Sequence, residues 1–375
     1  SLSFLAVKAR KDEAPDRGVP WYDWLGVAAT LLVTGYVAVR YPVLVNDLGS
    51  RPTERWILGI IAIAVTFEAT RRTVGMVLVW LAIGGILYTA FSHLMPGEFY
   101  APSSERREIA NYLYLDGNGL VGLPIRVFST IIITFILFGQ TLYALKGDRI
   151  LNDLAISVMG RYRGGPAKVA VAGSSLFGNI SGSVVSNVMM DGPVTIPMMV
   201  RAGYSRHMAA TIEAVASNGG QILPPVMGIT AFLIADWLNL PYSEIVLVAL
   251  IPALLYYIAL FIQVDLEAGW GGMHGLPEED IPPAGPVLKR SWVFILPLGV
   301  LVYTLLIAAW HPGRAALGAV IVALVVGTIN AETRPSLAEV WQAVVSTGKT
   351  LLDLIVIVAI AGIFIGALQL SGLAF

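Results

Sequence analysis

Residues 173–193 read GSSLFGNISGSVVSNVMMDGP, and residues 213–226 read EAVASNGGQILPPV. Both runs are rich in serine, asparagine or glycine, and the second contains a proline pair, although the surrounding chain is strongly apolar. Polar side chains and broken backbone are costly in hydrocarbon unless the protein encloses them around a site. The stretch from Gly173 to Pro225 therefore predicts the binding centre of a membrane transporter.

The composition indicates the class of protein around this stretch. Of 375 residues, 56% are hydrophobic and only 13% are charged, whereas a soluble domain carries roughly 25% charged residues. Runs of about 20 apolar residues predict an all-α polytopic membrane protein. The net charge of −1 gives no electrostatic reason to expect a nucleic-acid partner, and the absence of cysteine excludes disulfides and thiolate chemistry.

Eight apolar segments predict membrane spans: Trp21–Val39, Arg55–Ala69, Val74–Phe91, Leu123–Leu145, Ile245–Val264, Trp292–Ala309, Gly313–Ile329 and Thr350–Leu370. The positive-inside rule places the basic loops between them in the cytoplasm. With this orientation Leu123–Leu145 runs inward and Thr350–Leu370 runs outward. If each of them opens a structural half, the two halves are inverted, as in many secondary transporters.

The organisation of the chain follows from these spans and loops. We expect a small helical membrane region at 1–95, a periplasmic connector at 96–122 and the first half of a larger transport unit at 123–264. A cytoplasmic loop at 265–290 then leads to the start of a second, inverted half at 291–375. Ile150–Tyr162 and Ser336–Ser346 have the pattern of amphipathic helices. Both ends of the chain read as parts of helices, so we expect truncation at both ends.

Basic residues lie on both sides of the segment from 169 to 200: Arg161, Arg163, Lys168, Arg201 and Arg206. If both flanks are cytoplasmic, the segment enters and leaves on the same face. Its arms, Gly165–Gly178 and Val184–Met199, reach about 21–24 Å at roughly 1.5 Å per residue, less than a hydrocarbon core of about 30 Å. This predicts a re-entrant helical hairpin with its tip at Asn179–Ser183. The alternative is one ordinary span, Val169–Met189, whose small polar residues pack against neighbours.

A second irregularity follows the hairpin. Met208–Ser217 and Val226–Trp237 read as half-length helices joined by Asn218–Pro225. The Gly-Gly pair permits unusual backbone angles, and the Pro-Pro pair forbids helix continuation. The pattern predicts a discontinuous membrane helix, whose broken centre offers backbone groups to ions and anionic substrates. A merely kinked helix is the alternative.

The proposed tip is polar but uncharged, because no Asp or Glu occurs from Leu154 to Met190. Hydroxyl, amide and carbonyl oxygens are ligands for hard cations, so a neutral cage of them favours Na⁺, and an anionic substrate could meet helix N-termini there. Asp191 and Glu213 leave proton coupling open. The four histidines form no metal-ligand cluster, and Ser174 and Ser175 have no evident base partner, which leaves an enzyme as a remote alternative.

Longer motifs carry a family resemblance. Residues 176–238, from LFGNISGS to IADWL, and residues 251–268, IPALLYYIALFIQVDLEA, resemble the membrane permease of tripartite ATP-independent periplasmic (TRAP) transporters. The upstream runs WYDWLG (21–26) and EATRRTVG (68–75) are similar to the small-subunit part of fused permeases. The chain looks most like the type paired with TAXI-class binding proteins.

The resemblance implies Na⁺-driven import of a small organic anion, a carboxylate, that a TAXI-like periplasmic binding protein delivers. It also implies an elevator mechanism, with the first hairpin at Asn179–Asn187 and the first broken helix at Ser217–Pro225. The second hairpin is then expected beyond Phe375, so the chain would hold about half of the site. A carrier without a binding protein and a proton-coupled relative stay open.

The residues expected to bind Na⁺ are Asn179, Ser181, Gly182, Ser217, Asn218, Gly219 and Gly220. The residues expected to bind the substrate are Ser183, Ser186, Asn187, Gln221 and Pro224. No catalytic residue and no organic cofactor is expected.

Overall fold

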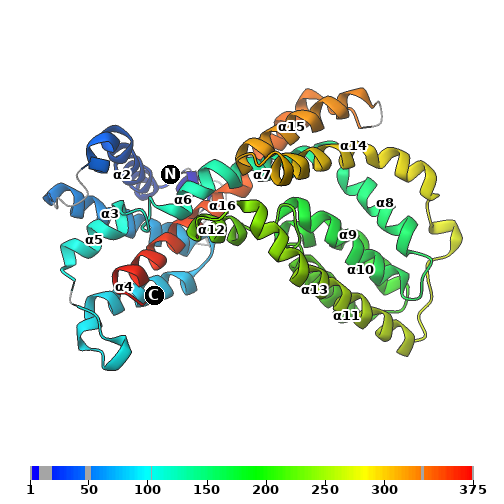
Figure 1. Cartoon of the computed structure of the whole chain (residues 1–375), viewed down its shortest axis with the longest axis horizontal. Helices are drawn as coiled ribbons and strands as arrows, with labels where there is room; N and C mark the ends of the chain where they lie inside the picture. Colours follow the sequence, from blue (N-terminus) through cyan, green and yellow to red (C-terminus); the bar gives the residue numbers. More distant parts are fainter. Residues whose placement is uncertain (1, 8–18, 47–51, 103, 331–332, 374–375) are drawn as a thin grey trace. The chain divides into compact units, whose positions relative to one another are not determined.

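The computed structural model describes residues 2–7, 19–46, 52–102, 104–330 and 333–373 (Figure 1). Within these residues the chain is helical and contains no β-strand. Its α-helices are α1 (Leu2–Ala6), α2 (Trp21–Asn46), α3 (Thr53–Thr73), α4 (Met76–Phe91), α5 (Arg106–Leu115), α6 (Leu123–Val127), α7 (Ile133–Ala144), α8 (Gly147–Met159), α9 (Gly165–Ser181), α10 (Val184–Arg201), α11 (Arg206–Gly219), α12 (Ile229–Trp237), α13 (Tyr242–Trp270), α14 (Ala284–Val302), α15 (Pro312–Ile329) and α16 (Leu337–Leu370). Short 3₁₀ turns lie at Ser92–Leu94, Gly97–Phe99 and Glu278–Asp280, and π-helical segments at Phe128–Ile132 and Tyr303–Ile307.

Seven helical stretches of the described chain are long and apolar enough to cross a membrane: Trp21–Leu44, Met76–Leu94, Leu123–Ala144, Tyr242–Trp270, Glu278–Ile307, Pro312–Ile329 and Leu337–Leu370. This confirms the predicted all-α polytopic membrane protein. Helix α3, which covers the short predicted span Arg55–Ala69, is not among the seven, and neither are α9, α10, α11 and α12.

The chain packs as two compact units. Unit 1 comprises Ser1–Ser129 and Gly348–Phe375, and unit 2 comprises Thr130–Thr347. These units follow the packing of helices, whereas the five predicted segments follow membrane topology and function. The five-segment division therefore stays a prediction.

In unit 1, α3 packs on α2 and α5, and the part of α16 within this unit lies against α4 and α5. The hydroxyl of Tyr114 on α5 donates to the carbonyl oxygen of Val33 on α2 at 2.7 Å. The predicted connector 96–122 is thus not all loop: α5 forms there because Ile109, Ala110, Leu113 and Tyr114 share one buried face.

A group of charges joins α2 to α3 in the same unit. Glu68 pairs with both Arg71 and Arg72 at 2.7 Å, and Arg72 also pairs with Asp23 at 2.5 Å. Arg72 and Asp23 are buried, and the guanidinium of Arg72 lies over the ring of Phe4 on α1. These contacts fix the first three helices of the unit against one another.

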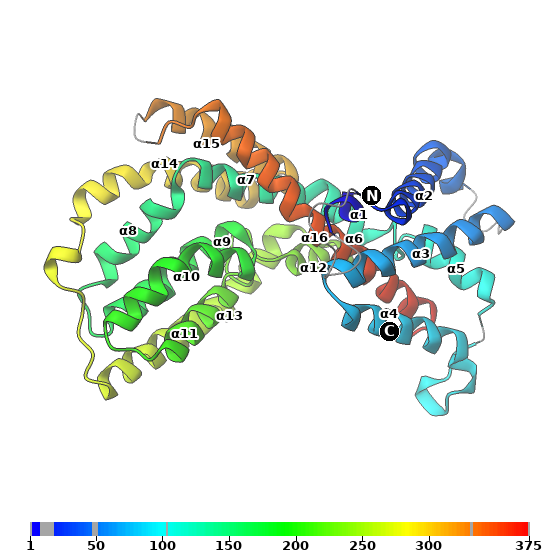
Figure 2. The same ribbon diagram turned by 180° about the vertical axis from the view of Figure 1, so that it is seen from behind.

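Unit 2 is built around the α9–α10 pair, which lies beside α11 and α13 in both ribbon views (Figures 1 and 2). Its core includes Met199, Ala209 and Tyr257, contributed by α10, α11 and α13. Helix α8 packs on α9, as an amphipathic helix with one apolar face can. It overlaps the amphipathic helix predicted at Ile150–Tyr162 but begins and ends three residues earlier.

Three boundaries differ from the sequence expectation. Helix α13 continues to Trp270 and α14 begins at Ala284, so the connection is shorter than the predicted loop 265–290. The amphipathic segment at 336–346 and the following span form one continuous helix, α16. No proline or loop-forming run separates them, and a helix that has started propagates at little further cost.

Candidate functional site

The α9–α10 pair is a helical hairpin with a tight turn. Helix α9 ends at Ser181 because Gly182 takes the left-handed conformation, with φ +60°, and its N–H bonds the carbonyl oxygen of Gly178 at 2.9 Å. Ser183 caps α10 by accepting the N–H of Ser186 at 3.4 Å. A single uninterrupted span over Val169–Met189 is therefore wrong. The turn occupies two residues instead of the predicted five.

The broken helix is also present, with its break slightly later than predicted. Helix α11 runs to Gly219, and α12 begins only at Ile229. Between them the N–H of Gly228 bonds the carbonyl oxygen of Gln221 at 2.7 Å, which closes the linker on itself. A simple kink would keep one helix on both sides of the bend, so the kinked-helix alternative is wrong.

The hairpin and the broken helix meet at two points of close backbone approach. A Cβ added to Gly178 would lie 2.4 Å from the Cα of Gly220, and one added to Gly182 would lie 2.2 Å from the carbonyl oxygen of Met227. Only glycine leaves room for such contacts. We call this region, formed by Gly178, Gly182, Gly220 and Met227, the junction.

Directly behind the junction lies a buried hydrogen-bond network. Glu213 on α11 has no exposed surface, and its Oε1 accepts the hydroxyls of Ser174 and Ser217, both at 3.2 Å. Its Oε2 lies 2.5 Å from the hydroxyl of Thr195 on α10. One carboxyl thus receives bonds from both arms of the hairpin and from the broken helix. We call these four residues the Glu213 network.

Asn187 connects this network to the junction. Its side-chain Nδ2 donates to the carbonyl oxygen of Ser174 at 2.9 Å and lies next to Gly178. That bond fixes the orientation of the amide. The other end, Oδ1, is buried and has no hydrogen-bond partner among the described residues, and the same is true of Oδ1 of Asn179. An unpartnered buried carbonyl oxygen calls for an explanation such as a bound ion or water.

The predicted Na⁺ ligands and the predicted substrate-binding residues all lie in unit 2. Asn187, Ser217, Gly219 and Gly220 are buried, whereas Asn179, Gly182, Ser183, Ser186 and Pro224 are partly buried. Asn218 and Gln221 are exposed. The side chain of Ser181 lies outside the described residues.

Three residues of the Glu213 network were not expected in the site. Ser174 was considered only as a serine without a base partner, Thr195 was not considered, and Glu213 entered only as a possible proton carrier. The tip itself lacks acids, and α11 supplies a buried carboxyl to the network beside it. The spacing of Glu213 and Ser217, four residues apart and so on one helix face, was the available signal.

A second polar contact lies farther along the hairpin. The amide of Asn152 on α8 donates to the carboxyl of Asp191 on α10 at 3.5 Å, and both residues are buried. The main-chain carbonyl oxygen of Asp191 also lies 2.9 Å from the hydroxyl of Thr195, whose single proton can serve either this carbonyl or the carboxyl of Glu213. This contact links α8 to α10, the second arm of the hairpin.

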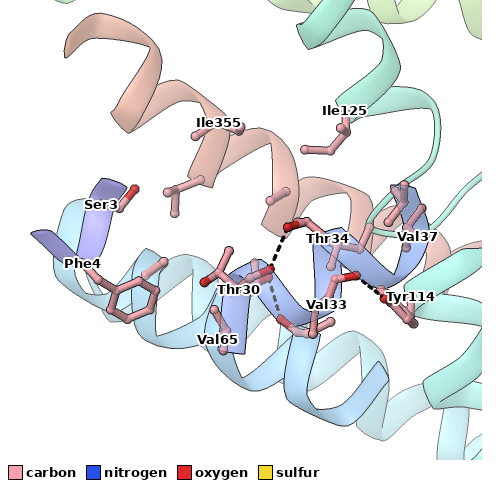
Figure 3. A pocket seen from close by; sticks show the side chains of 17 residues that line it. Ser3, Phe4, Thr30, Val33, Thr34, Val37, Val65, Tyr114, Ile125 and Ile355 are labelled. Atoms are coloured by element: carbon pink, nitrogen blue, oxygen red, sulfur yellow. Dashed lines mark hydrogen bonds between the residues drawn. The ribbon is translucent and has the colours of Figure 1, made fainter. Parts of the chain in front are cut away.

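Unit 1 contains a cavity of a different kind, with a volume of about 290 Å³ (Figure 3). Stripes of α2 and α3 line it, together with Ile355 and Val356 of α16. Its hydroxyls bond their own or a neighbouring backbone: Thr30, Thr34, Thr66 and Tyr114 donate to Gly26, Thr30, Ala62 and Val33. The cavity therefore offers little to an ion or an organic anion.

Comparison with known proteins identifies a family. Residues 61–375 match the family described as the tripartite ATP-independent periplasmic transporter, DctM component. The chain is 27% identical over 253 residues to the C4-dicarboxylate TRAP transporter large permease protein DctM of Pseudomonas aeruginosa, covering 64% of this chain and 58% of that protein.

Two further relatives carry other names. The ectoine/5-hydroxyectoine TRAP transporter large permease protein UehC of Ruegeria pomeroyi is 24% identical over 249 residues, 66% of this chain and 54% of its own. The isethionate TRAP transporter permease protein DctMQ of Oleidesulfovibrio alaskensis is 26% identical over 236 residues, 61% of this chain and 36% of its own. The chain thus spans between 36% and 58% of the length of these three relatives.

Proposed function

Because the chain belongs to the DctM component family of tripartite ATP-independent periplasmic transporters, we propose that it forms part of a Na⁺-coupled importer of a small organic anion. A periplasmic binding protein of the TAXI class delivers the anion. The family and the seven candidate spans make this a multi-pass protein of the inner membrane. The relatives' names include dicarboxylate, ectoine and isethionate, so the family alone selects no substrate.

The observation that supports Na⁺ most is the unpartnered Oδ1 of Asn187 beside the junction. Hard cations take oxygen ligands, and the residues predicted from sequence on the hairpin and the broken helix carry them. Asn179 and Asn187 would contribute side-chain carbonyls, Ser217 a hydroxyl, and Gly219 and Gly220 backbone carbonyls. Asn187, expected from sequence to touch the substrate, thereby becomes a proposed ion ligand. The bound ion would supply a positive charge toward which an anionic substrate is drawn.

The substrate would bind near the N-terminus of α10. The first turn of a helix presents unpaired N–H groups and a positive dipole end to an anion. Ser183 and Ser186 stand at this end and are partly buried. Pro224 of the linker would line the same space, whereas the exposed Gln221 would contact the substrate only after a rearrangement or with the help of other parts of the protein.

The elevator mechanism belongs to the same proposal. The hairpin, the broken helix and α13 share one hydrophobic core in unit 2, which supports their movement as one body. The inverted relation of the two halves rests on the predicted orientation of the spans that open them, Leu123–Leu145 and Thr350–Leu370.

Uptake by the full-length membrane protein in liposomes tests the function. With its binding protein and radiolabelled candidate anions outside, an inward Na⁺ gradient drives accumulation, and collapse of that gradient stops it. Sodium-independent uptake contradicts Na⁺ coupling. Uptake without any periplasmic protein indicates a carrier that needs no binding protein.

A proton-coupled importer is the second candidate, and the buried carboxyl of Glu213 is the observation that favours it. Buried ionisable groups in membrane proteins commonly mark proton or ion pathways. In the same liposomes, uptake driven by an inward pH gradient in Na⁺-free buffer would support this candidate over the first.

A further inference from the structure

We propose that Tyr257 on α13 is a positioning residue for the break in the broken helix. Its hydroxyl binds the backbone carbonyl group at which α11 stops being α-helical, and it thereby holds residues 217–220 in place beside the hairpin. This inference rests on the proposed Na⁺ site at the junction and adds to that site a residue of α13 that the sequence did not indicate.

Two neighbouring tyrosines of α13 bind the C-terminal part of α11, the helix beside it (Figures 1 and 2). The hydroxyl of Tyr256 donates to the carbonyl oxygen of Val215 at 2.7 Å, and that of Tyr257 donates to the carbonyl oxygen of Ala216 at 3.0 Å. Tyr257 and Ala216 are both buried in the core of unit 2, whereas Tyr256 is only partly buried. The bond of Tyr257 is therefore the one that is shielded from water.

The backbone bonding of α11 changes at Ala216. A continued α-helix would direct the N–H of Gly220 to the carbonyl oxygen of Ala216. That N–H instead bonds the carbonyl oxygen of Ser217 at 3.2 Å, and the next two N–H groups likewise bond carbonyl oxygens three residues earlier, at 3.2 and 3.1 Å. These are 3₁₀ turns. The carbonyl of Ala216 has thus lost its helical partner, and the hydroxyl of Tyr257 takes the place of that partner.

This exchange of partners fixes the broken helix at the junction. A buried carbonyl oxygen without a hydrogen bond is costly, so the bond to Tyr257 stabilises the point where the tighter turns begin. The first of these turns runs from Ser217 to Gly220, and Gly220 meets Gly178 of the hairpin so closely that neither has room for a side chain. A shift of this turn would therefore move Ser217 and Gly220, two of the proposed Na⁺ ligands, relative to the hairpin.

Helix α13 is itself fixed to the hairpin. Asp265, eight residues after Tyr257, pairs with Lys168 of α9 at 2.6 Å. At the other end of α13, the hydroxyl of Tyr242 lies 2.6 Å from the carbonyl oxygen of Val226 in the linker. One helix thus supports the hairpin and both sides of the break, so a bond from this helix can set the position of the break relative to the hairpin.

Two matched variants test the inference. Tyr257→Phe keeps the ring, which lies against the backbone of Gly219, and removes only the hydroxyl. Tyr256→Phe removes the same group from the neighbouring residue, but the carbonyl of Val215 keeps a helical partner, because Gly219, four positions later, still belongs to α11. The pair therefore separates the general loss of a phenol–carbonyl bond from the loss of the bond at the break.

The measurement is equilibrium binding of radiolabelled Na⁺ to the purified full-length protein, with the unfolding temperature recorded for each variant. We expect Tyr257→Phe to weaken Na⁺ binding about five- to tenfold, the factor that corresponds to one hydrogen bond, and Tyr256→Phe to stay within about twofold of the wild type. Both variants should show a similarly small fall in unfolding temperature. If Tyr257→Phe binds Na⁺ like the wild type, or no longer folds while Tyr256→Phe does, the hydroxyl serves stability alone and the proposal is overturned.

Failure of Na⁺ coupling and failure of the positioning role give different results. If the wild-type protein shows no saturable Na⁺ binding, Na⁺ coupling fails, and backbone hydrogen exchange decides the role of Tyr257. The amides of residues 220–222, which form the tight turns, should exchange faster in Tyr257→Phe than in the wild type or in Tyr256→Phe. Equal exchange rates in the three proteins would overturn the positioning role as well.

Discussion

The cavity of unit 1 and the region around the junction of unit 2 are both made from apolar helices that carry hydroxyl side chains. In the cavity the hydroxyls of Thr30, Thr34 and Thr66 bond carbonyl oxygens one turn earlier on their own helices. Behind the junction the hydroxyls of three helices converge on one carboxyl, and an amide oxygen is left without a partner. Polar residues in a membrane helix therefore indicate a site only where their donors and acceptors are directed away from their own backbone.

The largest expected effect comes from closing the junction. Gly178→Val places a side chain where the backbone of Gly220 lies within 2.4 Å, and overpacking of this kind costs about 1–3 kcal/mol or more. We expect loss of uptake and a lower unfolding temperature. Gly84 on α4 has open space around the same position, so Gly84→Val is the matched control and should keep near-normal uptake. Equal uptake by both variants would show that the hairpin and the broken helix do not need this contact.

Removal of the Asn187 side chain, whose Oδ1 has no hydrogen-bond partner among the described residues, should weaken Na⁺ binding specifically. Asn187→Ala is expected to raise the Na⁺ concentration for half-maximal uptake by about tenfold, since the loss of one ligand is worth about 1.4 kcal/mol or more. Asn111 on α5 is a matched control, because its Oδ1 is also buried and without a hydrogen-bond partner in the described part of the chain. Asn111→Ala should leave the Na⁺ dependence unchanged. A similar shift in both variants would mean that the amide of Asn187 has no special relation to Na⁺.

A pair of isosteric changes compares the hydroxyls of the two regions. Thr195→Val removes a contact to the buried Glu213 carboxyl and should lower the free energy of unfolding by about 1–3 kcal/mol, the range for leaving a buried polar group without its partner. Thr66→Val removes a hydroxyl that bonds only the carbonyl oxygen of Ala62 and should change stability by less than about 1 kcal/mol. Thermal unfolding in the same detergent measures both. Equal losses of stability in the two variants would contradict the proposed difference between the hydroxyls of the cavity and those of the Glu213 network.

The smallest effect is expected from filling the cavity. Ala62 lines it and is buried, so Ala62→Val adds apolar contacts where space exists. We expect stability to rise by up to about 1 kcal/mol with uptake unchanged. Uptake that falls while stability is kept would show that the cavity takes part in transport.

The main irregularities of the fold were predictable from sequence. The hairpin is indicated by the length of its two short arms between basic flanks. The broken helix is indicated by its Gly-Gly and Pro-Pro pairs, which act locally through backbone angles. The exact ends were less predictable, because Gly182 terminates α9 through its own φ angle while Asn179 and Ser181 stay helical. Helix α5 was missed because a ten-residue amphipathic helix with several charges resembles a polar loop.

The site could be predicted only in part. Asn187, Ser217 and Gly220 entered the predicted site because polar or flexible residues are unusual at membrane depth, and their roles as ligands stay predictions. The convergence of Ser174, Thr195 and Glu213 depends on how α9, α10 and α11 pack, and no local pattern in the sequence encodes that packing. Glu213 lies 22 residues beyond Asp191 and 39 beyond Ser174, so its role emerges only from the folded structure.

Equilibrium binding of radiolabelled Na⁺ to the purified full-length wild-type protein tests the central claim most directly. The account predicts saturable binding that K⁺ does not displace and that Asn187→Ala weakens while Asn111→Ala does not. Binding that fails to saturate, or that is the same in Asn187→Ala as in the wild type, would contradict a sodium site at the junction.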